Sequence, residues 1–75
     1  MSDAAESKLL KAFGKRVAEI RRARGLTQEQ LAEKADVTPL SIAFIEQGRR
    51  WPRIATLSKL AKCLNISPSE FLKGL

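Results

Sequence analysis

The amino-acid sequence predicts an all-α fold, a compact domain of five short helices. Apolar residues recur at spacings of three and four along most of the chain, which is the helical period. Ser or Thr residues suited to N-caps precede three of the helices, and proline follows two of these caps at the first helical position. No segment has the alternating pattern of a half-buried strand. A chain of 75 residues forms one core that buries roughly 60% of its unfolded surface, so dimerisation would add to a modest stability.

The first predicted helix follows residues 1–8, which are expected to be a frayed N-terminal extension of a domain spanning residues 9–75. Its apolar stripe has spacings of four, four and three and consists of Leu9, Phe13, Val17 and Ile20. Arg24 and Gly25 end this helix, because glycine accepts the left-handed conformation that commonly follows a helix.

The second and third predicted helices are close neighbours in the sequence. Thr27 and Gln30 form a capping box, so the second helix begins at Gln28 and has about two turns. Thr38 is the N-cap of the third helix and Pro39 its first residue. The residues expected to be buried beneath these helices are Leu31, Ala32, Ala35, Ile42 and Ile45.

Gly48 ends the third helix, and a loop of residues 49–53 leads to a fourth helix that begins at about Ile54. The apolar residues of the fourth helix are Leu57, Leu60, Ala61 and Leu64. A second capping box, Ser67–Glu70, is expected to start a short fifth helix with proline at its first position. The apolar residues of that helix are Phe71 and Leu72.

The net charge of +6 is unevenly distributed. Residues 8–24 hold seven basic residues and one acidic residue, and residues 49–62 hold five basic residues and no acidic ones. Residues 25–48 hold one basic and four acidic residues. Two basic segments around an acidic centre are typical of flanks that contact phosphates, although solvated helix faces have the same composition.

Several classes of protein are excluded by what the sequence lacks. No segment has the ~20 apolar residues that span a bilayer, and residues 1–10 do not resemble a secretory signal, so we expect a cytoplasmic protein without membrane contact. Cys63 has no second cysteine or histidine for a disulfide or a zinc site and is interpreted as a small apolar side chain on a helix. Without histidine, a Gly-rich phosphate loop or paired carboxylates, the chain is not expected to be an enzyme or to hold a metal or cofactor.

The second and third helices have the arrangement of a helix-turn-helix, in which two short helices joined by three or four residues let the second helix protrude into a DNA groove. The sequence resembles the Cro/cI family of lambda-repressor-like domains in three segments, RGLTQEQLA, IAFIEQGRRWP and TLSKLAKCLNISPSEFL. The resemblance covers about residues 17–72. It implies a five-helix fold, sequence-specific binding of double-stranded DNA and usually a twofold dimer.

The resemblance also implies roles for individual residues. The positions implied to contact DNA are Gln28, Thr38, Pro39, Leu40, Ser41, Phe44, Gln47, Arg49, Arg50 and Arg53. Gln28 would bond a phosphate and steady the recognition helix, residues 38–47, unless it serves only as the start of its own helix. Gln47 and Arg49 match phosphate-contacting positions. Arg53 would approach the minor groove between half-sites, unless it is only a solubilising side chain.

Other positions match the family or depart from it in ways that affect structure. Arg21 and Glu46 match an internal ion pair that links the first helix to the third. Asp36 stands where many members have glycine in a left-handed turn, and aspartate tolerates that conformation better than most residues. Arg53 replaces the usual Ser or Thr cap of the fourth helix.

The recognition helix has an unusual outward face. With its two isoleucines turned to the core, Leu40 and Phe44 lie on the opposite side. No Arg, Lys, Asn or Gln lies between Thr38 and Glu46, so the usual side chains that read purines are absent there. We therefore expect a site rich in thymine-methyl contacts, with specificity added by groove shape around Arg53.

The function favoured by the sequence is a transcriptional regulator that binds a near-palindromic operator as a homodimer, with half-site centres roughly 34 Å apart. The expected dimer contact consists of Ile66, Phe71 and Leu72 together with Trp51. Trp51 has two other interpretations, stacking near the sugar-phosphate backbone or shielding Pro52. An alternative function is a protein-interaction module that uses the surface of Leu40, Phe44 and Trp51, and a third is a bare structural bundle. The sequence does not choose among phage repressors, restriction-modification controllers and antitoxins, or between repression and activation.

Overall fold

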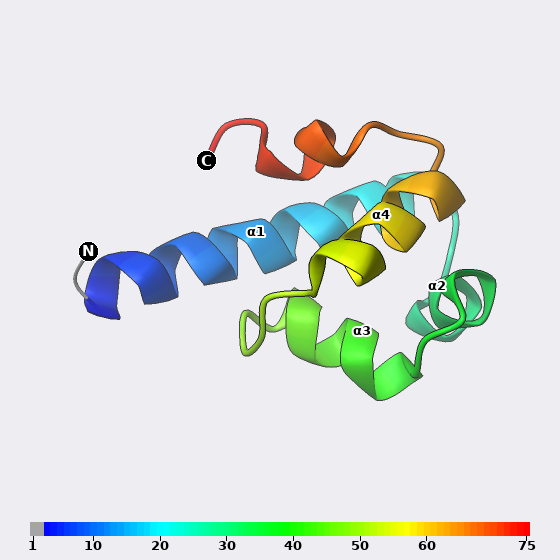
Figure 1. Ribbon diagram of the computed structural model, residues 1–75, viewed down its shortest axis with the longest axis horizontal. Helices are drawn as coiled ribbons and strands as arrows, with labels where there is room; N and C mark the ends of the chain where they lie inside the picture. Colours follow the sequence, from blue (N-terminus) through cyan, green and yellow to red (C-terminus); the bar gives the residue numbers. More distant parts are fainter. Residues whose placement is uncertain (1–2) are drawn as a thin grey trace.

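Four α-helices and one short 3-10 helix make up residues 3–75, the part of the chain that the computed structural model describes (Figure 1). The elements are α1 (Asp3–Ala23), α2 (Gln28–Ala35), α3 (Pro39–Glu46), α4 (Ile54–Cys63) and the 3-10 helix η1 (Pro68–Leu72). No strand occurs within residues 3–75. The predicted all-α class is therefore confirmed, with the fifth element a 3-10 helix instead of an α-helix.

The capping box predicted at Ser67 does not form in the fifth element. The Ser67 hydroxyl lies 3.0 Å from the hydroxyl of Ser69 and makes no bond to a backbone N–H of the helix. The backbone N–H of Glu70 instead donates to the Ser67 carbonyl at 3.0 Å, which is the i to i+3 bond of a 3-10 turn.

The helix α1 is longer than the sequence analysis expected. It begins at Asp3, so residues 3–8 of the expected frayed extension form its first turns, while residues 1–2 lie outside the described residues. Asp3 and Glu6 in the first turn and two arginines in the last turn have the charges that the helix dipole favours at each end. At 21 residues α1 is about 31 Å long, which accounts for the 35 Å long axis of the molecule. Neither α1 nor any other helix in residues 3–75 is long and apolar enough to cross a membrane.

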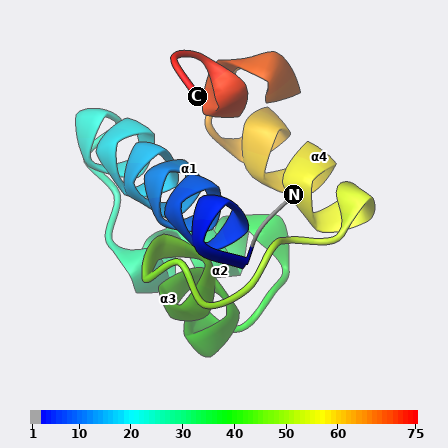
Figure 2. The ribbon, with the colours of Figure 1, turned by 90° about the vertical axis from the view of Figure 1, so that its left-hand side faces the viewer.

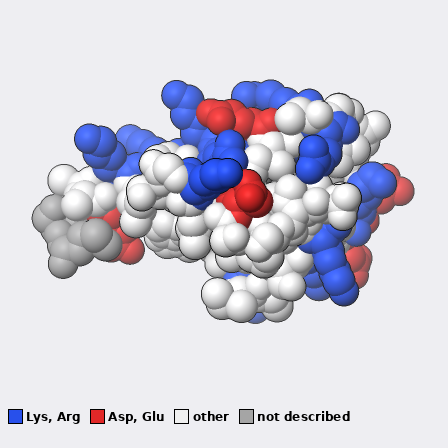
Figure 3. All heavy atoms as spheres, turned by 90° about the horizontal axis from the view of Figure 1, so that it is seen from above, with Lys and Arg blue, Asp and Glu red and all other residues white. Residues whose placement is uncertain are grey.

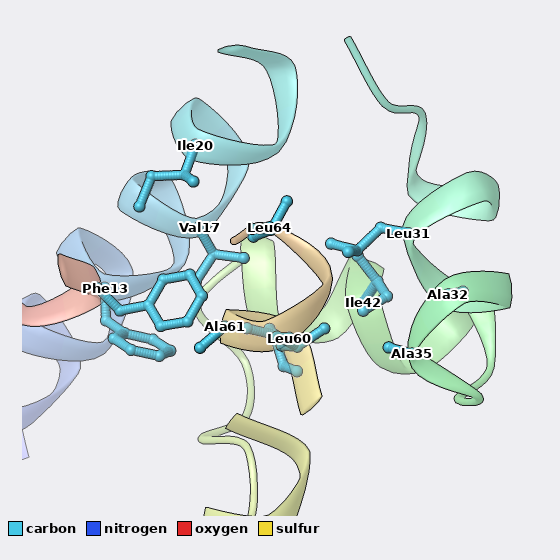
Figure 4. Close-up of a cluster of buried hydrophobic side chains, with 12 residues drawn as sticks. Phe13, Val17, Ile20, Leu31, Ala32, Ala35, Ile42, Leu60, Ala61 and Leu64 are labelled. Atoms are coloured by element: carbon cyan, nitrogen blue, oxygen red, sulfur yellow. The ribbon is translucent and has the colours of Figure 1, made fainter. Parts of the chain in front are cut away.

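The hydrophobic core lies where the four α-helices meet. Seen along α1, η1 lies on one side of this helix and α3 on the other (Figure 2). Phe13 and Val17 of α1 point toward Leu60 and Leu64 of α4, and Leu31 of α2 completes the cluster with Ile42 of α3 (Figure 4). The fully buried apolar side chains include Val17, Leu31, Ile42, Leu60, Leu64 and Phe71. Burial of these side chains, at about 1.5–3 kcal/mol each, provides the main force that holds the helices together.

Candidate nucleic-acid interface

The helix α2 and the turn after it have the geometry that the sequence predicts. The Thr27 hydroxyl accepts from the Gln30 backbone N–H at 3.0 Å, and the Gln30 side chain accepts from the Thr27 N–H at 2.8 Å, so this capping box is confirmed. Asp36 has φ 55°, the left-handed conformation expected there. Val37 then donates to the Ala32 carbonyl at 3.0 Å, which closes the end of α2 and turns the chain toward α3.

Both ends of α3 are fixed by local bonds. The Thr38 hydroxyl accepts from the Ser41 backbone N–H at 3.1 Å, and Pro39 is the first helical residue. At the other end Gly48 has φ 72°, and Arg49 donates to the Phe44 carbonyl at 2.9 Å. The helix therefore has the predicted bounds, with Thr38 and Gln47 as its caps.

The outward surface of α3 is only partly apolar. Leu40 is 61% exposed, as expected from its position opposite the buried isoleucines. Thr38, Pro39 and Gln47 are also exposed, and Ser41 is half-buried. Phe44 differs from the expectation of a free outward ring, because it is half-buried beneath the guanidinium groups of Arg49 and Arg50, which lie 4.7 Å and 5.3 Å from its ring centre.

A buried polar cluster joins α3 to α1 and α2. Arg21 donates to both carboxylate oxygens of Glu46, at 2.7 Å from Nε and 2.9 Å from Nη2, so the ion pair implied by the resemblance is present. A third donor of Arg21 bonds the Leu26 carbonyl at 2.7 Å. The Gln28 amide also donates to Glu46, at 2.9 Å. These bonds hold the C-terminal end of α3 against the two other helices.

The guanidinium of Arg21 keeps its charge. The hydrogen bond to Glu46 raises the pKa of Arg21, against the lowering effect of burial and with support from the charge of Glu46. Arg21 therefore stays protonated near neutral pH, and all its N–H groups remain donors for Glu46 and the Leu26 carbonyl.

The loop of residues 49–53 places three arginines between α3 and α4. Trp51 packs against Phe13 of α1, with ring centres 5.1 Å apart, and this contact anchors the loop. Arg53 is exposed at the N-cap of α4 and makes no side-chain cap bond. A shallow depression of about 260 Å³ between α3 and α4 has Ser41, Arg50, Arg53 and Thr56 among its lining residues. The guanidinium groups of the loop thus lie beside the hydroxyl groups of Ser41 and Thr56 at one edge of α3.

The four residues expected at a dimer contact differ in their exposure. Phe71 is fully buried against Phe13, with ring centres 6.1 Å apart, because it fills the space between η1 and α1 within one copy of the chain. Its assignment to a dimer interface is therefore wrong. Ile66 is half-buried and packs against the core. Leu72 is 52% exposed and Trp51 is 37% exposed, so these two side chains remain accessible.

Lys11 is a basic residue near α3 that the sequence motifs did not single out. A side chain at Gly48 would come within 2.8 Å of the Lys11 Cα, so the end of α3 lies directly against α1 at Lys11. The helical spacing of lysines along α1 was the signal that could have indicated this. Figure 3 shows basic side chains along the edge of the molecule that starts beside the N-terminus.

Comparison with known proteins identifies relatives with the same arrangement. A helix-turn-helix family model matches residues 17–71. The chain is 47% identical over 58 residues to the HTH-type transcriptional regulator PuuR of Escherichia coli (strain K12), a match that covers 77% of this chain and 31% of PuuR. It is 45% identical over 59 residues to the immunity repressor protein of Bacillus phage phi105, which covers 79% of this chain and 41% of the repressor. The chain thus spans less than half the length of these two relatives.

A solved structure of similar size has the same fold. The restriction-modification controller protein C.AhdI from Aeromonas hydrophila superimposes with a TM-score of 0.81 at 37% identity, covering 83% of this chain and 94% of that protein. The chain therefore belongs to the helix-turn-helix family of the Cro/cI (XRE) type, which its sequence motifs had indicated.

Proposed function

We propose that the chain is a transcriptional regulator that binds double-stranded DNA sequence-specifically, with α3 in the major groove. The observation that carries this proposal is the attachment of α3 through Glu46, which holds the helix by one end and leaves Leu40 exposed on its outer side. Arg49, Arg50 and the neighbouring loop add positive charge beside this surface, where phosphates would lie.

Individual contacts follow from the position of each group. Gln28 uses one N–H of its amide for Glu46, and the second N–H is directed to a phosphate in this proposal. Thr38 keeps its hydroxyl hydrogen as a donor, because its oxygen accepts the capping bond. The remaining proposed contacts come from Pro39, Leu40, Ser41, Phe44, Gln47, Arg49, Arg50 and Arg53.

Sequence preference would depend on apolar contacts more than on purine readout. Leu40, the most exposed apolar side chain of α3, is suited to contact thymine methyl groups. Leu40→Ala should therefore relax the sequence preference in a selection from random duplexes, while overall affinity falls less. An unchanged preference would contradict the role of Leu40 in base recognition.

Salt dependence tests DNA binding itself. Affinity for duplex DNA should fall steeply with salt, and Arg49→Ala and Arg53→Ala should each lower the slope of log K against log salt by about one. Lys59→Ala, a change at an exposed position of α4 outside the proposed site, is the matched control and should keep the slope. Absence of duplex binding by the unmodified protein at low salt would reject the proposal.

We also propose a homodimer on a near-palindromic operator, in which Leu72 and Trp51 contribute to the contact. Two observations support this proposal: the exposed fractions of the two side chains, 52% and 37%, and the packing of Trp51 on Phe13, which fixes its position. Sedimentation at increasing concentration should give a dimer for the unmodified chain and a monomer for Leu72→Glu. A Leu72→Glu variant that still dimerises would show that the dimer interface does not include Leu72.

A protein-interaction module is the second candidate function. It is favoured by the exposure of Leu40 at 61% and of Ile54 at 81%, since exposed apolar side chains mark partner surfaces. The same salt experiment separates the two functions, because an apolar protein contact would respond little to salt.

A further inference from the structure

One face of α1 carries basic residues that no contact within the domain accounts for. Lys8, Lys11, Lys15 and Arg22 are spaced by three, four and seven residues, so at the helical period they lie within about 60° of one another. All four are exposed. We call them the basic face of α1.

The basic face points away from the core and borders α3 at one edge. At 100° per residue Lys8 lies opposite the fully buried Val17. Gly14, about 60° from Lys11 on the helix, faces α3, because a side chain at Gly14 would meet the Glu46 carbonyl at 2.8 Å. Lys11 itself borders Gly48 at the end of α3. Another side of α1 is turned to η1, where Arg16 donates to the Glu70 carbonyl at 3.1 Å.

One acidic residue lies beside this face, since Glu19 follows Lys15 by four residues and precedes Arg22 by three. Within residues 3–75, however, no salt bridge involves Lys8, Lys11, Lys15 or Arg22. The salt bridges there pair Arg16 with Glu19 and Glu70, and Arg21 with Glu46. With Glu19 counted, this side of the helix keeps an excess of three positive charges, which attracts an extended anion.

We propose that the basic face of α1 binds the phosphate backbone of DNA beyond the phosphates reached from α3. This inference rests on the proposed DNA binding and extends its site. From Lys8 to Arg22 the helix rises about 21 Å. Phosphates of one strand repeat every ~3.4 Å along the duplex axis, so the face spans about six of them. Its contact with Gly48 makes it continuous with the basic loop of residues 49–53.

The test compares two triple variants that each remove three positive charges. Lys8→Gln/Lys11→Gln/Lys15→Gln changes the basic face, and glutamine keeps a helix propensity close to that of lysine. The matched control, Lys34→Gln/Lys59→Gln/Lys62→Gln, changes three lysines that line a separate depression between α2 and α4. Circular dichroism checks that both variants keep the helical fold.

The expected result is a salt slope lower by about two to three for the basic-face variant and by less than one for the control. Shortening the duplex by about six base pairs on one flank should weaken the unmodified protein and leave the basic-face variant unchanged. An unaltered slope for the basic-face variant, or equal losses in both variants, would overturn the inference while leaving the proposed function intact. A failure of the unmodified protein to bind duplex DNA would instead reject the proposed function itself.

Discussion

The carboxylate of Glu46 occupies a position that is unfavourable by itself. It lies in the last residue of α3, where the negative end of the helix dipole opposes a negative side chain. Burial adds a second cost, since only 5% of its side chain is exposed. Three donated hydrogen bonds, two from Arg21 and one from Gln28, offset both effects. The position of α3 therefore depends on donors from two other helices.

Removing Arg21 should expose this dependence. Arg21→Met leaves the Glu46 carboxylate buried with one donor, and we expect the free energy of unfolding to fall by roughly 3 kcal/mol. The double variant Arg21→Met/Glu46→Leu removes the buried charge as well and should recover most of the loss. Urea denaturation of the two variants and the parent measures both effects. Equal stability of the single and double variants would mean that the buried carboxylate is not the cause.

Phe44 offers a test of whether a ring on α3 reads bases or positions charges. Because both neighbouring guanidiniums lie over the ring, Phe44→Ala should release Arg49 and Arg50 and weaken binding to all duplexes, by about tenfold. Sequence preference should persist, in contrast to Leu40→Ala. Phe44→Leu keeps apolar bulk without a ring and should lose similar affinity. A Phe44→Leu variant that binds DNA like the parent would show that apolar bulk at this position is sufficient and that the aromatic ring is not required.

At the scale of elements, the crossing of α1 and α3 depends on the absence of a side chain. Gly14 lies in the interior of α1, where alanine would favour the helix by about 1 kcal/mol. A side chain there would overlap the Ile45 carbonyl at the end of α3. Helix propensity and packing therefore oppose each other at this residue, and the geometry requires packing to prevail.

Gly14→Ala should consequently destabilise the domain, by about 2–3 kcal/mol, despite its better propensity. Gly25→Ala is the control, because its added side chain meets nothing within 4 Å and costs only the left-handed conformation, about 1 kcal/mol. Thermal unfolding of both variants gives the comparison. A stabilised Gly14→Ala variant would show that α1 and α3 can separate without loss.

Local sequence signals predicted some elements better than others for physical reasons. The Thr27 capping box and the left-handed Asp36 depend on bonds between near neighbours, so their patterns were sufficient. The same pattern at Ser67 did not give a capping box, since the Ser67 hydroxyl bonds the Ser69 hydroxyl and makes no cap bond to the backbone. The two arginines over Phe44 could not be predicted, since a loop without periodicity determines where their side chains fold back.

At the scale of the whole molecule, an aromatic chain connects segments distant in sequence. Phe13 in α1 contacts Trp51 of the loop on one side and Phe71 of η1 on the other. The helical stripe predicted Phe13 as a core residue, but Phe71 was assigned to a dimer surface, because a short terminal helix does not reveal which of its apolar residues faces inward. The fold of η1 against α1 is therefore a tertiary property, which local patterns do not contain.

The C-terminal segment should consequently be part of the cooperative fold. Phe71→Ala removes a fully buried ring and should cost about 3–5 kcal/mol, a large share of the roughly 4–11 kcal/mol expected for a domain of 75 residues. Leu75→Ala, a change at an exposed apolar position of the same C-terminal segment, is the matched control and should change stability by less than 1 kcal/mol. Trp51 emission follows unfolding, since its ring packs on Phe13. If η1 is an integral part of the domain, Phe71→Ala lowers the midpoint of unfolding. Trp51 emission and the circular dichroism of the helices then report the same single transition. Two separate transitions would instead show that η1 detaches while the helix-turn-helix remains folded.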